Sequence, residues 1–326
     1  MEKHEIIILG DGRTAVVCAQ SAKKKYPEKS VAILISDYKC FTDLISSLFT
    51  FFVILNKRED FQFFLDSYKI NVIVDEAIDR IGHKLHLKSG RIILHEKLIL
   101  AQGCKCPSLP IEGLNKKGVY FLKVNFDQIF EIKKLALNSD RIVIYGGSYI
   151  GIKLADELLN SNKNVILIEK SSWLLPETID SSLGREVLVL LAEQGCKVIL
   201  NKRVKKIIGN AKICAVEISN SEIIECDILL ISCKSKPNVD FAKKLGLICD
   251  NERGILVDEY CRTSEKDIFA VGECAAHFDF FRGDLAEAIL SSTYILECSI
   301  VGSNLYSVIY NRYNLLENLY SFNEVL

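Results

Sequence analysis

The apolar positions of this chain fall into short runs that alternate with stretches of helical period, and two segments repeat the same order of elements. In 5–35 and again in 141–169, an apolar run leads into a glycine-rich turn, a helical stretch and a second apolar run. The predicted strands are 5–9, 31–35, 141–145 and 165–169, and the helices reach to about residues 25 and 160. Each segment therefore predicts a βαβ unit.

The remaining runs add strands and helices to these two units. The most apolar stretch, Leu44–Leu55, is shorter than the about 20 residues that span a bilayer, and charges at 57–60 close it. We predict a core helix there, with an interfacial segment as the alternative. The other predicted elements are strands from about 70 to 103 with a hairpin turn at Lys88-Ser-Gly90-Arg, a helix at about 182–194, strands at 196–200, 204–209, 215–219, 227–232, 253–260 and 266–273, and a long helix from about Leu285.

Composition supports a globular protein with more than one domain. The chain has 326 residues, of which 49% are hydrophobic and 25% charged, which is enough for two domains with a core each. The formal net charge is −1 with Lys and Arg scattered along the chain, so we expect no nucleic-acid partner. The N-terminus enters a strand directly without the pattern of a signal peptide, so we expect a cytoplasmic location and no membrane span.

The first glycine turn has the parts of a dinucleotide site. A strand that ends in Gly-x-Gly and opens a helix lets backbone N–H groups approach a pyrophosphate, and a carboxylate after the next strand accepts hydrogen bonds from a ribose. Gly10 and Gly12 form this turn, Ala15 takes the third small position, and Asp37 follows the second strand.

The second turn repeats the pattern with one change. Gly146 and Gly151 are present, Ser148 replaces the middle glycine, and Glu169 ends the strand 165–169. A carboxylate at that place favours a free 2′-hydroxyl, and so NAD over NADP. One such turn is weak support, because glycine turns also open helices for structural reasons, but two with acids predict two dinucleotide sites.

Other catalytic constellations are absent from the sequence. No Ser/His/Asp set, paired carboxylates or metal-ligand spacing is found, so we predict no metal and assign no catalytic side chain. The twelve cysteines include no Cys-x-x-Cys pair, and Cys18 in the first helix is predicted to pack in the core. The histidines, predicted to be exposed or to have internal partners, are His4, His83, His86, His95 and His277.

Four motifs together resemble the FAD-dependent pyridine nucleotide-disulfide oxidoreductase superfamily, especially its NADH:rubredoxin reductase, ferredoxin reductase and nitrite-reductase-like flavoproteins. Besides the two turns, Glu96-Lys-Leu-Ile-Leu-Ala-Gln-Gly103 is similar to the family's Tyr-Asp-Lys-Leu-x-x-Ala-Thr-Gly motif. Thr263-Ser-Glu-Lys-Asp-Ile-Phe-Ala-Val-Gly272-Glu273 is similar to its late flavin motif, and Lys236-Pro237-Asn238 to the Arg-Pro-Asn that ends its NAD domain. The resemblance covers nearly the whole chain.

The resemblance implies an α/β fold of two Rossmann-like three-layer dinucleotide-binding domains. The FAD-binding domain would be built from 1–112 and 240–326, and the NAD(H)-binding domain, 113–239, would be inserted in it. The implied activity is hydride transfer from NADH to FAD, with electrons passed to a small rubredoxin- or ferredoxin-like protein or another acceptor. The implied FAD contacts are Gly10, Gly12, Thr14, Ala15, Asp37, Ile78, Gln102, Gly103, Gly272 and Glu273, with a backbone contact to adenine at Ile78. The implied NAD(H) contacts are Gly146, Gly147, Ser148, Tyr149, Ile150, Gly151 and Glu169.

The chain departs from the family pattern at several contacts, and two alternatives stay open. Departures are Ser148 for glycine, Gln102 for threonine, Glu273 for aspartate, Lys234 for glycine, and Lys153 where relatives usually carry a glutamate near the nicotinamide. One alternative is a degenerate, non-catalytic nucleotide-binding subunit. The other is a single-cysteine thiol or peroxide reductase that uses Cys40, which falls shortly after the second strand. The oligomeric state is left open.

Overall fold

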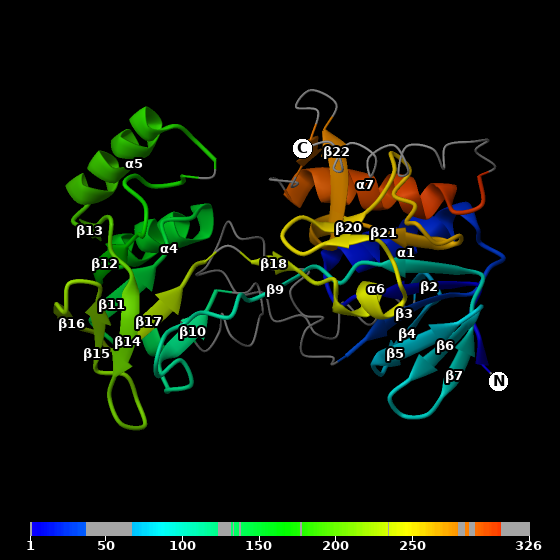
Figure 1. Cartoon of the computed structure of the whole chain (residues 1–326), viewed down its shortest axis with the longest axis horizontal. Coiled ribbons are helices and arrows are strands. Elements are labelled where there is room, and N and C mark those ends of the chain that lie inside the picture. Colours follow the sequence, from blue (N-terminus) through cyan, green and yellow to red (C-terminus); the bar gives the residue numbers. More distant parts are fainter. Residues whose placement is uncertain are drawn as a thin grey trace, which may run out of the picture. The chain divides into compact units, whose positions relative to one another are not determined.

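The computed structural model describes residues 2–36, 67–122, 132, 134–136, 138–176, 178–233, 235–279, 284–286 and 291–307. The chain divides into two compact units (Figure 1). Of the described residues, those up to Lys105 and from Lys236 onward form the first unit, and Cys106 to Ser235 form the second. The second unit is thus inserted in the chain of the first. The boundaries expected at residues 112 and 239 lie a few residues further along the chain.

A five-stranded parallel sheet in the order β21-β8-β2-β3-β4 lies at the centre of the first unit. Its strands are β2 (Ile6–Leu9), β3 (Val31–Ile35), β4 (Ile70–Val74), β8 (Lys97–Leu100) and β21 (Ile268–Ala270). Successive side chains of β2 point to opposite faces, so Ile6 and Ile8 enter one core cluster while Ile7 and Leu9 enter another. Burial on both faces explains the unbroken apolar runs of these strands.

Helices cover one face of this sheet and a second sheet covers the other. Helices α1 (Arg13–Lys25) and α7 (Ser291–Asn304) lie side by side on the face of Ile6 and Ile8 (Figure 1). The opposite face carries α6 (Asp240–Lys244) and the sheet β1-β7-β6-β5. The strands of that sheet are β1 (Glu2–Lys3), β5 (Ala77–Ile81), β6 (Lys84–Leu87) and β7 (Ile92–Leu94). The first unit therefore has three layers.

The sequence predicted the β6–β7 hairpin correctly and misplaced the start of the last helix. At the predicted turn Gly90 has φ +87° and its N–H donates to Leu87 O (2.9 Å). The helix expected from about Leu285 begins only at Ser291, because Asp284–Ala286 forms β23 and pairs antiparallel with β22 (Ala275–Asp279). The remaining elements are β9 (Cys104–Lys105), β18 (Lys236–Pro237), β19 (Cys249–Asp250), β20 (Gly254–Leu256) and the 3-10 helix η2 (Gly272–Cys274).

The second unit repeats the three-layer plan. Its five-stranded parallel sheet has the order β10-β17-β11-β12-β13, with β10 (Val119–Phe121), β11 (Arg141–Tyr145), β12 (Asn164–Ile168), β13 (Lys197–Ile199) and β17 (Ile228–Ile231). Helices α4 (Tyr149–Asn160) and α5 (Ser181–Glu193) pack on one face. An antiparallel sheet packs on the other, made of β14 (Val204–Ile208), β15 (Ala215–Ile218) and β16 (Ile223–Glu225). The predicted α/β fold of two such units is confirmed.

Local sequence signals explain where α5 begins and ends. The Asp180 carboxylate accepts hydrogen bonds from the N–H groups of Ser182 (2.7 Å) and Leu183 (3.1 Å), which would otherwise lack partners at the helix N-terminus. Gly195 follows the helix with φ +95°, a conformation that favours glycine, and stops it. The helix predicted at about 182–194 is confirmed.

Candidate dinucleotide-binding sites

Three predicted motifs of the first unit, far apart in the sequence, meet at one edge of its parallel sheet. Gly10 follows β2, Gln102 follows β8 and Gly272 follows β21, and these three strands are neighbours. Backbone hydrogen bonds hold the strand ends together: Gly10 N to Leu34 O (3.1 Å), Ala101 N to Leu9 O (2.8 Å) and Val271 N to Leu100 O (2.9 Å). The carboxyl edge of an open parallel sheet is where such folds bind ligands.

The two glycines of the first turn serve different purposes. A Cβ added at Gly10 would lie 2.1 Å from Ala101 O, so the turn can pass the end of β8 only as glycine. A Cβ at Gly12 would meet nothing closer than Thr14 Oγ1 at 3.9 Å, so the space above it is open. Gly12 also caps α1 without a side-chain bond, which leaves the first N–H groups of the helix for an anion.

The predicted flavin motif at 263–273 packs against the first glycine turn. Gly272 has φ +72°, and a Cβ there would lie 2.9 Å from Thr14 Cγ2. Its N–H donates to Glu297 Oε1 of α7 (3.2 Å). Glu273 is exposed next to it, and a Cβ at Gly103 would lie 3.8 Å from Glu273 Oε2. Thr14, Gly103, Gly272 and Glu273 are thus brought together as the sequence predicted, although their cofactor contacts stay predictions.

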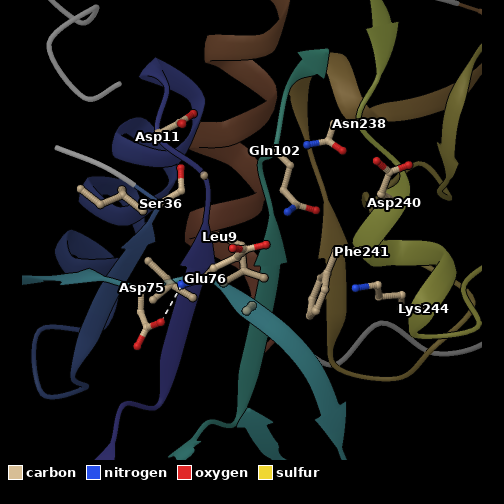
Figure 2. A pocket seen from close by; sticks show the side chains of 14 residues that line it. Leu9, Asp11, Ser36, Asp75, Glu76, Gln102, Asn238, Asp240, Phe241 and Lys244 are labelled. Carbon is tan, nitrogen blue, oxygen red and sulfur yellow. Dashed lines mark hydrogen bonds between the residues drawn. The ribbon is translucent and has the colours of Figure 1, made fainter. Parts of the chain in front are cut away.

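A pocket of about 310 Å³ opens at this edge, and Figure 2 shows its walls. Ser36 and Asp75 stand on one side, Phe241 and Lys244 of α6 on the other, and the Gln102 carboxamide extends toward the middle. Gln102 Oε1 is a buried acceptor with no hydrogen-bond partner among the described residues. Because an unpaired buried acceptor costs free energy, a ligand hydroxyl or amine is the group that fits it.

Most carboxylates around the pocket already have partners within the first unit. Asp75 accepts from Ser89 N (3.3 Å) and Ser89 Oγ, Glu76 pairs with Lys88 (2.6 Å), and Asp240 pairs with Lys105 (2.6 Å). Asp11, in the middle of the glycine turn, also lines the pocket. The pocket is therefore acidic at the turn itself.

Ile78, the predicted adenine contact, lies at an irregularity of strand β5. The register of β5 on β6 shifts between Ala77 and Asp79, so Ile78 is the extra residue of a β-bulge and stands outside the ladder. Its neighbour Ala77 lines the pocket. Asp37, the predicted ribose contact, lies outside the described residues.

The turn of the second unit is built like the first. A Cβ at Gly146 would lie 2.1 Å from Ser232 O at the end of β17, and a Cβ at Gly151 would lie 2.3 Å from Gly146 O. The Ser148 hydroxyl accepts from Gly151 N (3.3 Å) and lies 2.6 Å from Ser232 Oγ. The hydroxyl is therefore bonded inside the turn as the N-cap of α4, so replacing the middle glycine keeps the turn's shape.

Glu169 is tied to the same turn. Its Oε2 accepts from Gly147 N (2.6 Å) and its Oε1 from Ser171 N (2.8 Å), and the residue is only 4% exposed. Tyr149, by contrast, is 59% exposed beside the turn, and Ile150 is half-buried. The predicted residues of the second site thus gather at one sheet edge, with Glu169 supporting the turn from within.

The two units differ in where the acid stands. Gly10 N donates to Leu34 O and Gly146 N to Ile168 O, so Leu34 and Ile168 occupy equivalent places. The next residues are Ile35 in the first unit and Glu169 in the second. By register, the place of Glu169 is taken in the first unit by Ile35, a buried side chain at 1% exposure.

The side chain of Lys153, which was predicted to lie near the nicotinamide, pairs with acidic residues of its own helix. Its Nζ lies 3.5 Å from Glu157 Oε1 and 3.9 Å from Asp156 Oδ2, one turn further along α4. Lys234 and Cys40 lie outside the described residues. The thiol-enzyme alternative therefore stays a sequence-level hypothesis.

The prediction for Cys18 is confirmed, and the prediction that His95 is exposed or has an internal partner is met at one of its two ring nitrogens. Cys18 is fully buried and its Sγ donates to Cys298 O of α7 (3.2 Å), which is a packing role. His95 is 2% exposed and its Nε2 accepts from Arg80 Nε (3.2 Å). Its Nδ1 has no hydrogen-bond partner among the described residues, and burial lowers the pKa of the ring to about 4.

Sequence reasoning missed Ser232 and Glu297, although both left a signal. Ser232 is the last residue of the strand predicted at 227–232 and directly follows β17, the place that Ala101 takes after β8 in the first unit. Glu297 is a single acid in an apolar helix, a pattern that indicates a polar contact inside the protein. Within the described ranges, no helix is long and apolar enough to cross a bilayer, and no three His, Cys, Asp or Glu side chains gather as a metal site would require.

Comparison with known proteins gives a consistent picture. The sequence matches the family described as pyridine nucleotide-disulphide oxidoreductase over residues 4–293. It is 24% identical over 294 residues to the assimilatory nitrate reductase electron transfer subunit of Bacillus subtilis, covering 85% of this chain and 36% of that protein. It is 26% identical over 227 residues to the rubredoxin-NAD(+) reductase of Pseudomonas putida, covering 69% and 58%. The chain therefore spans between about a third and three fifths of these relatives.

The fold has relatives among solved structures. The ferredoxin reductase from Rhodopseudomonas palustris superposes with a TM-score of 0.81 at 20% identity, over 96% of this chain and 78% of that one. At this identity the likeness establishes the shared fold of two dinucleotide-type units.

Proposed function

Because the chain belongs to the pyridine nucleotide-disulphide oxidoreductase family, we propose that it is an FAD-dependent NAD(P)H oxidoreductase. FAD would bind the first unit, expected from the sequence at 1–112 and 240–326, and NAD(H) would bind the second, expected at 113–239. When bound, FAD supplies the redox chemistry by accepting a hydride from NADH and passing electrons to an acceptor. The protein's own groups bind and orient the two dinucleotides.

One observation carries this proposal: the two units close their glycine turns in the same way. At Gly10 and at Gly146 an added Cβ would lie 2.1 Å from the carbonyl oxygen that ends the neighbouring strand. Each turn then opens a helix whose first N–H groups face the carboxyl edge of the sheet. Two copies of a pyrophosphate-type cradle in one chain support two dinucleotides rather than one.

Different residues of the first unit suit successive parts of a flavin dinucleotide. The bulged backbone of Ile78 suits the adenine, and the open space over Gly12 with the start of α1 suits the pyrophosphate. Gln102 Oε1, unpaired in the pocket, suits a hydroxyl group beyond the pyrophosphate. No side chain is assigned a proton-transfer role.

For the acceptor, we propose a small electron-transfer protein. This rests on the relatives of the chain, which include a rubredoxin-NAD(+) reductase and a ferredoxin reductase. Electron transfer to a partner needs a flavin that is reduced by a nicotinamide cofactor, and the two turns provide a place for each.

The test is the visible spectrum of the purified protein after incubation with FAD. Flavin bands that NADH or NADPH bleaches under anaerobic conditions are the expected result, followed by reoxidation when oxidised rubredoxin or ferredoxin is added. A protein that stays colourless after incubation with FAD would contradict the proposal.

One observation favours the degenerate, non-catalytic alternative. Asp11 puts a carboxylate in the middle of the first turn, where a pyrophosphate would carry its own negative charge. If that repulsion excludes FAD, the same spectrum shows no flavin bands while the second unit still binds NADH, which can be followed by the fluorescence of the nicotinamide.

A further inference from the structure

Glu297 is the only acid in the described part of α7, and its side chain reaches the flavin motif at 263–273. The helix is otherwise built of apolar and small polar residues, and Glu297 is half-buried in it. A carboxylate is costly to bury unless it accepts hydrogen bonds. Its Oε1 accepts one from Gly272 N (3.2 Å), which explains why an acid is tolerated at this place.

The orientation of the Gly272 peptide depends on this contact. Gly272 has φ +72° and lies against Thr14 of the first glycine turn, where an added Cβ would be 2.9 Å from Thr14 Cγ2. Among the described residues, Glu297 Oε1 is the only acceptor for Gly272 N. A glycine has no side chain that packing could hold in place. The hydrogen bond from Gly272 N is therefore what fixes this peptide.

A second hydrogen bond holds the Glu297 carboxylate itself. Cys261 Sγ donates to the same Oε1 atom (3.5 Å). Cys261 is 4% exposed, has φ +59°, which is uncommon for a residue with a side chain, and is tied to β21 because Ala270 N donates to Cys261 O (3.0 Å). Burial and the charge of Glu297 raise the pKa of the Cys261 thiol, so the thiol keeps its proton and remains a donor. One carboxylate oxygen thus joins α7, the loop before β21 and the flavin motif.

We propose that Glu297 is a positioning residue of the FAD site, whose Oε1 fixes the Gly272 peptide against the first glycine turn and so sets the shape of the cradle that holds the cofactor. The inference rests on the proposed function, because it requires that FAD binds the first unit. The essential property is an acceptor oxygen within reach of Gly272 N, and the negative charge is secondary. Without that oxygen, Gly272 N and Cys261 Sγ lose the acceptor that they share.

Three substitutions separate the reach of the side chain from its charge. Glu297→Gln keeps an oxygen at the same reach and loses the charge, Glu297→Asp keeps the charge but is one methylene shorter, and Glu297→Ala has neither. The full chain saturated with FAD is diluted, and the rise of flavin fluorescence on release gives the affinity. We expect Glu297→Gln to stay within about threefold of the wild type, and Glu297→Asp and Glu297→Ala to bind FAD at least about tenfold more weakly, as the loss of a hydrogen bond to a charged group implies.

Ser299→Ala is the matched control. Ser299 Oγ lies 3.3 Å from Ser21 Oγ, so this variant removes a hydrogen bond between α7 and α1 without touching the flavin motif. We expect it to bind FAD as the wild type does. The visible circular dichroism of the bound flavin gives a second readout, which should change in Glu297→Asp and Glu297→Ala and stay as in the wild type in Glu297→Gln and Ser299→Ala. A role limited to the stability of α7 would lower the melting temperature without changing this signal.

The possible outcomes distinguish this inference from the proposed function. Glu297→Ala that binds FAD within about threefold of the wild type overturns the inference and leaves the proposed function in place. If Glu297→Ala does not fold, Glu297→Gln and Glu297→Asp decide, and equal FAD affinities in these two variants overturn the inference. Wild-type protein that does not bind FAD overturns the proposed function and the inference with it.

Discussion

At the residue scale, the fold requires one glycine of the first turn, whereas the other is open to a ligand. Gly10 is fixed by the protein, because its Cβ position is already occupied by Ala101 O at 2.1 Å. Gly12 is not, because its Cβ position is open and its φ of −106° suits any residue. The open position is therefore the one that reports on the cofactor.

We predict that Gly12→Ala folds with nearly wild-type stability but binds FAD at least about tenfold more weakly. The methyl group enters the space where backbone N–H groups would approach a pyrophosphate, so the loss falls on the ligand. Thermal unfolding of the FAD-free protein and fluorescence titration with FAD separate the two effects. Equal FAD affinity in the variant and the wild type would show that nothing binds above Gly12.

The buried ring of His95 makes a prediction about pH. Its pKa of about 4 in the folded protein lies below the ordinary value of 6.5, so the unfolded chain takes up the proton first and stability falls as pH drops from 6.5 toward 4. Between pH 7 and pH 5 this ring should cost about 2 kcal/mol of unfolding free energy. Urea unfolding at both pH values should show that loss, and His95→Gln should remove it.

The control for this experiment is His83→Gln. His83 is exposed and stacks edge-on against His95 at 5.8 Å between ring centroids, so its removal leaves the burial of His95 in place. The pH dependence should then stay close to that of the wild type. If His95→Gln keeps the wild-type slope, His95 is not the group that titrates.

Residue identity alone predicted the positions of these contacts but not their geometry. The sequence showed that Ser148 replaces a glycine, but only the place of Ser232 shows that the hydroxyl is bonded within the turn, at 2.6 Å. The same holds for Glu169, whose backbone partners Gly147 and Ser171 are set by the fold of the turn. Hydrogen bonds that depend on several chain segments cannot be predicted from one segment.

At the element scale, buried apolar runs and capped helices were predicted well, and the last helix was not. Both βαβ units, the hairpin at Gly90 and α5 follow from local patterns that the tertiary structure agrees with. The prediction of a helix from about Leu285 is wrong because residues 284–286 form a strand that pairs with β22. The helical period of the local sequence cannot reveal that contact. Tertiary pairing overrides a local preference there.

The contact between α1 and α7 gives a prediction for Gly302→Leu. A Cβ at Gly302 would lie 2.5 Å from Cys18 O and 3.0 Å from Ser21 Cβ, so a leucine forces the helices apart and costs about 1–3 kcal/mol. Displacing α7 also moves Glu297 away from Gly272 N, which it now holds at 3.2 Å. We therefore expect a lower melting temperature together with reduced FAD content.

Ile300→Ala serves as the control for this element. Ile300 is on the same helix but 52% exposed, so its truncation leaves the contact with α1 intact and changes stability by less than about 0.5 kcal/mol. If Gly302→Leu melts like the wild type, the helices do not approach as closely as the structure shows.

At the scale of the whole molecule, one plan has been used twice with different details at the ligand edge. Each unit has a parallel sheet of five strands with helices on one face and a smaller sheet on the other. The smaller sheet is antiparallel in the second unit and mixed in the first, where β1 pairs parallel with β7. The sequence predicted this duplication, because each copy has its own glycine turn. It did not predict that Ile35 stands in the register place of Glu169, since strand pairing sets that equivalence. The two sites should therefore be separable by mutation.

Gly151→Val tests that separation. A Cβ at Gly151 would lie 2.3 Å from Gly146 O and 3.1 Å from Ser232 Cβ, so a valine distorts the turn of the second unit, whereas the turn of the first lies in a separate core. We expect a protein that keeps its flavin spectrum and is reduced by dithionite, but that NADH reduces about tenfold more slowly or not at all. Leu190→Ala, at a residue of α5 that is 61% exposed, should be reduced by NADH at the wild-type rate. Hydride transfer to a flavin in the first unit requires that the protein holds the nicotinamide cofactor. If NADH reduces Gly151→Val at the wild-type rate, that cofactor must bind elsewhere, and the second turn has only a structural role.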